Sequence, residues 1–174
     1  DLSNLPLAEI LGSASALPVA VENDCTMALI AECAVGAANG KNNAVMFTIG
    51  TGIGGAIVMD GQPAYGHATA GQLGHITVQP NGVRCNCGRL GCVETTSSGT
   101  ALNRHIREAN LSPDTDVAKL LDAAKAGVSG AIELLSKWAT PLRYATTSMS
   151  AAIDPDIVLI GGGLGWAMDR ALAG

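Results

Sequence analysis

Four side chains of the kind that bind metals restrict what this chain can fold into more than any other feature. His75, Cys85, Cys87 and Cys92 occur in a segment rich in glycine, asparagine and short polar residues. Such a segment has too few apolar side chains to order itself by burial. One histidine and three cysteines match the tetrahedral ligand set of closed structural Zn²⁺ sites. The sequence therefore predicts a structural zinc ion in an insertion of about residues 65–95, with no open position for a catalytic water.

A disulfide, or simply free thiols, is the alternative explanation for these cysteines. A bridge between Cys85 and Cys87 would join residues two positions apart, which is difficult without strain. The other two cysteines, Cys25 and Cys33, lie in a helical pattern, so the distribution is not that of a disulfide-rich scaffold. No apolar run approaches the ~20 residues that span a bilayer, and residues 1–4 lack the pattern of a signal peptide. We therefore expect a cytoplasmic protein without membrane contact.

The composition favours an α/β fold. The chain has 174 residues, of which 48% are hydrophobic, so it can bury a core as one domain or one large lobe. Only 3% of the residues are aromatic, whereas 22 are glycines, so small side chains and tight turns should build that core. The formal net charge of −5 argues against nucleic-acid contact by this chain, because phosphate binding needs clustered Lys and Arg.

Apolar spacing and turn residues predict alternating helices and strands. The expected elements are a helix at 27–38, strands at 44–49 and 56–59, a short strand at 75–78, helices at about 101–109, 117–126 and 131–152, a strand at 157–160 and a helix beginning near 166. Asn23 or Asp24 could cap the first helix, and Gly40 would close it. Pro141 predicts a kink or a break in the long helix. The glycine-rich residues 50–55 predict a turn where backbone N–H groups could approach a phosphate, although a purely structural turn is equally compatible.

Two runs resemble the signature of the ROK family, usually written G-E-x-G-H followed by C-x-C-G-x-x-G-C-x-E. They are Gly71-Gln72-Leu73-Gly74-His75 and residues 85–94, and the Glu22-Asn23-Asp24 run and residues 50–55 precede them in the family's order. ROK proteins are sugar kinases and sugar-responsive repressors. The resemblance implies an actin-like ATPase (ribonuclease H-like) α/β fold, with a mixed sheet flanked by helices and the zinc-stabilised insertion. Residues 1–174 would form a single C-terminal lobe, with the N-terminal lobe absent.

The resemblance also implies roles for individual residues. Asp24 would be the catalytic base that takes the proton of a sugar hydroxyl, although helix capping is a plainer role for it. The implied substrate ligands are Asn23, Asp24, Gln72, His75 and Glu94. The implied nucleotide contacts are Gly50, Thr51, Gly52, Gly54, Gly161, Gly162 and Gly163. His75 would place one imidazole nitrogen on zinc and the other near the sugar.

Two features depart from the family pattern. Gln72 stands where the family usually has Glu, and its amide replaces one acceptor with a donor and removes the charge. The chain also lacks the D-x-G-G-T phosphate motif and the helices that normally follow the Gly161 region. We therefore expect a partial protein that does not transfer phosphate efficiently alone, because such kinases close two lobes around their substrates. Exposed apolar surface would favour a homodimer.

Three hypotheses for the function follow. The first is an ATP- and Mg²⁺-dependent kinase of a hexose, such as glucose or an N-acetylhexosamine, which the intact Asn23, Asp24 and His75 favour. The second is the sugar-sensing domain of a ROK-family transcriptional regulator, which is compatible with Gln72 and would carry its DNA-binding segment upstream. The third is a zinc-stabilised α/β domain without a sugar site.

Overall fold

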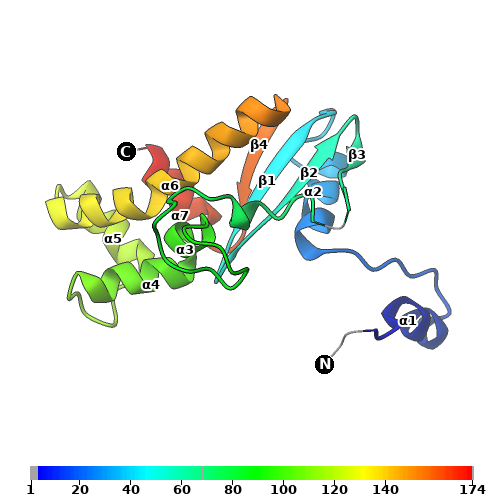
Figure 1. Ribbon diagram of the computed structural model, residues 1–174, viewed down its shortest axis with the longest axis horizontal. Helices are drawn as coiled ribbons and strands as arrows, with labels where there is room; N and C mark the ends of the chain where they lie inside the picture. The colour runs from blue at the N-terminus through cyan, green and yellow to red at the C-terminus, as the bar shows by residue number, and fades with distance from the viewer. Residues whose placement is uncertain (1–3, 68, 174) are drawn as a thin grey trace.

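The computed structural model describes residues 4–67 and 69–173. A central four-stranded sheet separates one helix from a group of helices on its other side (Figure 1). The elements are, in order, α1 (Leu7–Ser15), α2 (Asp24–Val35), β1 (Ala44–Ile49), β2 (Ile53–Met59), β3 (Gln62–Pro63), the 3₁₀ helix η1 (Leu73–His75), α3 (Glu94–Ser97), α4 (Gly99–Glu108), α5 (Val117–Lys125), α6 (Ser129–Ile153), β4 (Ile157–Gly161) and α7 (Gly165–Ala173). The expected mixed sheet flanked by helices is confirmed.

The sheet has the strand order β3-β2-β1-β4 and mixes the two pairing directions. β1 pairs antiparallel with β2 and parallel with β4, so that Thr48 lies opposite both Gly54 and Gly161. Because β1 and β4 are parallel, their carboxyl ends reach the same edge of the sheet. Ligands of α/β proteins commonly bind at such an edge, and here both glycine-rich segments begin there.

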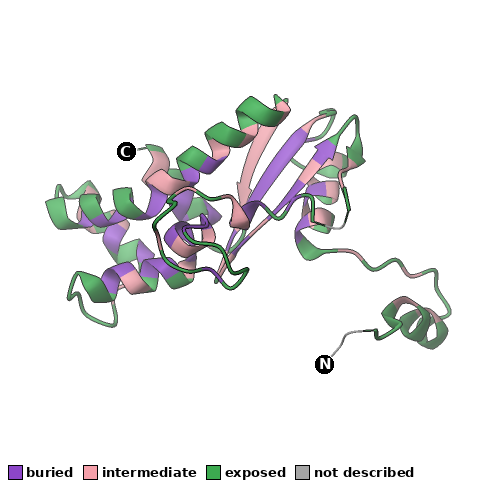
Figure 2. Cartoon of the chain, viewed as in Figure 1, coloured by how far each residue is buried: buried purple, intermediate pink, exposed green. Residues whose placement is uncertain are grey.

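Alternate residues of β1 enter two different cores. Val45, Phe47 and Ile49 face the larger core, which α4 to α7 build around the fully buried Trp138. Ala44 and Met46 face a smaller core under α2. This period of two is what a strand buried on both faces requires, and Figure 2 shows β1 and the inner helix faces as the most buried parts. α1 has no buried residue and stands apart from the sheet (Figure 1).

Two predicted elements differ from the structure. The helix predicted at 27–38 has other bounds, and the strand predicted at 75–78 is absent. α2 ends at Val35, because the Glu32 side chain accepts the N–H of Ala37 at 2.7 Å and the chain turns away at Gly36. Residues 75–78 form no strand. The chain there turns through η1 and keeps one isolated bridge, between Thr77 and Cys92, which brings His75 toward the cysteines.

β2 begins at Ile53, three residues earlier than predicted, because two glycines of the expected turn serve the strand instead. A Cβ atom on Gly54 would overlap the sulfur of Cys25, and one on Gly55 would come within 2.6 Å of Leu73 Cγ. Glycine is therefore needed there for close packing of α2 and η1 on the strand. A break at Pro141 was also wrong, since α6 continues through it and neighbouring buried residues such as Trp138 and Leu142 hold the helix in the core. α1 was not predicted.

Candidate functional site

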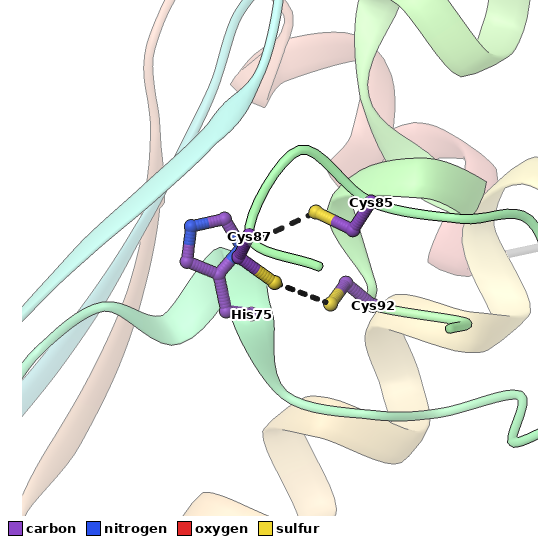
Figure 3. A group of neighbouring side chains, drawn as sticks. All are labelled: His75, Cys85, Cys87 and Cys92. Atoms are coloured by element: carbon purple, nitrogen blue, oxygen red, sulfur yellow. Dashed lines mark hydrogen bonds between the residues drawn. The ribbon is translucent and has the colours of Figure 1, made fainter. Parts of the chain in front are cut away.

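The four predicted metal ligands lie together in the structure (Figure 3). The ligand atoms of His75, Cys85, Cys87 and Cys92 are all within 4.8 Å of one another. His75 Nδ1 is 3.5 Å from Cys85 Sγ, and Cys87 Sγ is 3.5 Å from Cys92 Sγ. Zinc–ligand distances of about 2.3 Å to sulfur and about 2.0 Å to nitrogen place tetrahedral ligands about 3.5–3.8 Å apart. The observed separations fit such an ion.

Tight turns of the backbone bring the cysteines together. Cys85 N–H donates to Arg89 O at 2.8 Å and Gly88 N–H donates to Cys85 O at 2.9 Å, closing a turn in which Gly88 has a φ of 90°. Gly91 has a φ of 67°, and a side chain there would overlap the carbonyl of Gln79. All five cysteines are free in the structure, so none of the described residues forms a disulfide.

The sulfur atoms differ in their electrostatic surroundings. A hydrogen bond from the Arg89 guanidinium lowers the pKa of Cys87 to about 6. Burial raises the pKa of Cys92 to about 12, and the neighbouring Cys87 and Cys85 add to the rise. One thiolate is thus present at neutral pH before metal binds, while a divalent cation would have to displace the proton of Cys92.

A pocket of about 410 Å³ lies beside this cluster, at the edge where β1 ends. It collects most of the residues predicted to bind ligands, from five separate parts of the chain. Its lining includes Asn23, Asp24, Cys25, Thr48, residues 49–55, Gln72, Glu94 and Gly162. The glycine-rich residues 50–55 and the candidate base, Asp24, therefore line the same pocket.

Asn23, rather than Asp24, caps α2. Asn23 Oδ1 accepts the N–H groups of Cys25 at 3.0 Å and Thr26 at 3.3 Å, which leaves its amide NH₂ as a donor. Asp24 is the first helical residue, and its Oδ1 accepts the N–H of Cys25 at 2.9 Å. The Asp24 carboxylate is exposed in the first turn of α2.

The start of α2 is fixed on the sheet by Cys25. Its buried sulfur lies 3.0 Å from Thr48 Oγ1 on β1 and packs where Gly54 lacks a side chain. Burial raises the pKa of the Cys25 thiol, and the Asp24 carboxylate adds to the rise, so the thiol stays protonated at neutral pH. The position of Asp24 over the pocket thus depends on a neutral, tightly packed neighbour.

Glu94 has a contact that the sequence did not predict. Its Oε2 accepts the N–H of Ile53 at 3.0 Å, and its Oε1 lies 3.9 Å from Cys85 Sγ. A Cβ atom on Gly52 would come within 2.6 Å of Oε2, so glycine is needed for this approach. Glu94 therefore connects the metal cluster to the glycine-rich loop, a contact between residues 41 positions apart that no local pattern indicates.

The remaining predicted residues divide between the pocket and its surroundings. Gly162, with a φ of 84°, lines the pocket, whereas Gly161 pairs with Thr48 inside the sheet and Gly163 accepts the indole N–H of Trp166 at 3.1 Å. His75 lines an adjacent cavity of about 460 Å³, which Gln72 shares with the main pocket. In Figure 3 the second imidazole nitrogen of His75 points away from the sulfurs, toward the strands.

Among the described residues, no helix combines the length and hydropathy needed to cross a bilayer.

Comparison with known proteins identifies relatives along the whole chain. The model of the ROK family matches residues 1–172. The chain is 36% identical to a glucokinase of Halalkalibacterium halodurans over 97% of this chain and 56% of that protein. It is 34% identical to an N-acetylmannosamine kinase of Yersinia pestis over 96% of this chain and 57% of that protein. The chain thus spans a little more than half the length of these relatives.

Solved structures show the same fold. A ROK hexokinase from Thermus thermophilus superposes with a TM-score of 0.85 and 35% identity, covering 98% of this chain and 62% of that one. A ROK glucokinase from Streptomyces griseus, in complex with glucose and AMPPNP, superposes with a TM-score of 0.81 and 28% identity, covering 97% of this chain and 61% of that one. A ROK transcriptional regulator, described as a homologue of the E. coli MLC protein, superposes with a TM-score of 0.78 and 28% identity. The match covers 96% of this chain and 44% of that one. The expected actin-like α/β fold is confirmed, and the chain belongs to the ROK family.

Proposed function

We propose that this chain is the C-terminal sugar- and zinc-binding lobe of an ATP-dependent kinase that phosphorylates a hexose such as glucose or an N-acetylhexosamine. One observation carries the proposal: the Asp24 carboxylate and the glycine-rich loop line the same pocket of about 410 Å³. Phosphoryl transfer to an alcohol needs this pairing, a base for the hydroxyl proton beside donors for the transferred phosphate. Relatives that are glucokinases and N-acetylmannosamine kinases support the substrate class.

In this proposal Asp24 takes the proton of the attacking sugar hydroxyl. The capping bonds occupy Asn23 Oδ1 and leave its NH₂ free to donate to the same sugar. Glu94, which is half-buried, accepts from another hydroxyl while it holds Ile53. Gln72 and the second nitrogen of His75 complete the set, and the amide of Gln72 supplies a donor that a carboxylate would lack.

The nucleotide would occupy the glycine-rich side of the pocket. Gly50, Thr51, Gly52 and Gly54 line this side, and the Gly50 N–H closes the loop by donating to Gly52 O at 3.0 Å. Other backbone N–H groups of the loop and the Thr51 hydroxyl would approach the phosphates, and residues 161–163 would adjoin the nucleoside. A Mg²⁺ ion bound with the nucleotide would neutralise charge that develops on the phosphates. A zinc ion on His75, Cys85, Cys87 and Cys92 would keep the insertion folded and His75 oriented.

The remaining parts of the proposal concern the protein's organisation. Residues 1–174 would form one lobe, which closes against a second lobe during catalysis. The free cysteines support a reducing, cytoplasmic location. The apolar side chains that α1 and its flanks leave exposed, such as Ile10 and Leu17, support further contacts, including a homodimer.

A kinase assay on the polypeptide extended to its relatives' length tests the proposal. We expect ATP- and Mg²⁺-dependent phosphorylation of a hexose, which Asp24→Asn reduces by a factor on the order of 10² or more, as expected for loss of a general base. Asp60→Asn is the matched control, since Asp60 lies in the turn after β2, outside the pocket, and has a φ of 50° that asparagine tolerates. Full activity in the Asp24 variant would remove Asp24 as the base.

The regulator hypothesis has one observation in its favour, the amide of Gln72 in place of the family's usual carboxylate, together with the likeness to the ROK transcriptional regulator. A sensing domain would bind the sugar without turning it over. Calorimetry that shows hexose binding by the extended protein, together with no phosphorylation and a DNA-binding segment upstream, would replace the kinase proposal with this one.

A further inference from the structure

The two tryptophans of the chain lie in opposite surroundings. Trp138 is fully buried in the larger core, where its indole N–H donates to Ser98 O at 2.9 Å. Trp166, in the first turn of α7, is 47% exposed. In a chain with only 3% aromatic residues, a large ring held at the surface, four residues after the pocket-lining Gly162, is available for stacking.

Two contacts fix the orientation of Trp166. Its indole N–H donates to Gly163 O at 3.1 Å, which holds the polar edge of the ring against the glycine-rich turn. The Arg170 guanidinium, one helical turn further along α7, lies over the ring with its carbon 5.4 Å from the ring centroid. The ring is therefore pre-oriented, and the cation beside it favours a negatively charged ligand.

The turn that anchors Trp166 reaches the pocket on one side of the glycine-rich loop. Leu164 N–H donates to Ile49 O at 2.9 Å, and Gly162 packs on the same residue and lines the pocket. Glu94, in contrast, contacts the loop at Ile53. A phosphate chain bound at residues 50–52 would thus have the sugar ligands at one end and the Gly162 turn, with Trp166 beyond it, at the other.

We infer that Trp166 is the stacking surface for the nucleobase of the phosphoryl donor, with Arg170 supporting the ring from its own side. This inference rests on the proposed function and adds a binding residue to it. A base presents a flat π surface that stacks on indole, whereas the groups suited to a polyol, the carboxylates of Asp24 and Glu94, line the pocket itself. The nucleobase is therefore the occupant that this position fits.

A comparison of two ligands separates stacking from other effects of the side chain. AMPPNP and inorganic tripolyphosphate, each with Mg²⁺, share the phosphate chain but differ in the base. Binding to the wild type, Trp166→Ala and Trp166→Phe is measured by calorimetry. We expect Trp166→Ala to weaken AMPPNP binding on the order of 10-fold, the size of base–aromatic stacking, and to leave tripolyphosphate binding unchanged. Trp166→Phe, which keeps a ring, should retain most of the affinity.

Fluorescence of the unmutated chain gives an independent readout that does not depend on how a variant folds. Since Trp138 is buried, acrylamide should quench mainly Trp166. AMPPNP should protect Trp166 from acrylamide, and tripolyphosphate should not.

The possible outcomes distinguish the inference from the proposed function. If AMPPNP binds the wild type and Trp166→Ala equally well, or binds without protecting the indole, Trp166 is not the stacking surface, and the kinase proposal stands. A parallel loss of affinity for both ligands also overturns the inference, because it assigns Trp166 a structural role. If the wild type binds no nucleotide at all, both the inference and the nucleotide site of the proposed function are wrong.

Discussion

The carboxylate of Glu94 and the backbone N–H of Ile53 are joined by a hydrogen bond of 3.0 Å that connects the metal cluster with the glycine-rich loop. Glu94 is two residues from Cys92 and opens α3, so a change in the cluster reaches this carboxylate directly. Ile53 opens β2, so the same bond fixes one end of the loop. The insertion and the loop should therefore be ordered together rather than independently.

Gly52→Ala should break this connection. The new Cβ atom would lie 2.6 Å from Glu94 Oε2, so the carboxylate must rotate away and release Ile53 N–H. Loss of a hydrogen bond to a charged group in a half-buried site should lower the free energy of unfolding on the order of 1–2 kcal/mol. Chemical denaturation measures this change, and hydrogen exchange at the Ile53 amide should become faster.

Gly50→Ala is the matched control for that substitution, since it adds the same methyl group to the same loop. A Cβ atom on Gly50 would meet nothing within 4 Å, so the free energy of unfolding of the Gly50→Ala variant should be unchanged or slightly raised. Equal destabilisation by both substitutions would mean that the backbone of the loop, and not the Glu94 contact, limits stability.

Metal removal should unfold the insertion while the sheet persists. The segment from Thr69 to Cys92 contributes few buried apolar residues, so without an ion little besides turns orders it. We expect about one zinc ion per chain by elemental analysis, and Cys85→Ser should lose it. Exchange protection should then fall in residues 76–92 but stay high in β1. Cys33→Ser, which removes a thiol from α2 instead, should keep the ion. A metal-free wild type with an ordered insertion would contradict the zinc assignment.

The parts of the site that could be predicted from the sequence depend on residue type and short spacing. Few roles other than metal binding place three cysteines and a histidine in one polar segment, so the cluster around Cys85 and Cys92 could be identified directly. For the N-terminal cap of α2, the sequence left two neighbouring candidates, Asn23 and Asp24. The structure assigns the cap to Asn23, and this choice depends on where the first helical turn begins.

The parts that could not be predicted depend on long-range packing. Gly54 and Gly55 carry a turn signal, yet they lie in β2, because α2 and η1 approach the strand too closely for a side chain. Pro141 carries a helix-breaking signal, yet core packing on both sides outweighs it. The bond between Glu94 and Ile53 joins distant segments. In the first two cases a tertiary contact overrides the local structural preference, and in the third the contact has no local sequence signal.

Below about pH 6.5, the free energy of unfolding should fall because the buried His105 is neutral in the folded protein. This side chain is 5% exposed, and its Nε2 lies 3.2 Å from Thr96 O while its Nδ1 lies 3.5 Å from Glu108 Oε2. Burial lowers the pKa of His105, and the Lys137 and Arg104 charges lower it further, although Glu108 and the Thr96 carbonyl oppose the shift. Between the lower folded pKa and the unfolded value near 6.5, the unfolded chain binds more protons. The stability contributed by neutral His105 is thus present above that interval and is lost as the pH falls through it.

Denaturant unfolding between pH 8 and pH 5 measures this loss, with the metal content held constant. His105→Gln should have a shallower dependence on pH than the wild type over the interval. His67→Gln, which changes an exposed histidine, is the control and should keep the wild-type slope. The difference between the two variants isolates His105 from the thiols, whose metal binding also weakens in acid. If His105→Gln instead has the wild-type slope, His105 binds protons equally in the folded and unfolded chain, and the burial of a neutral imidazole does not govern the acid sensitivity.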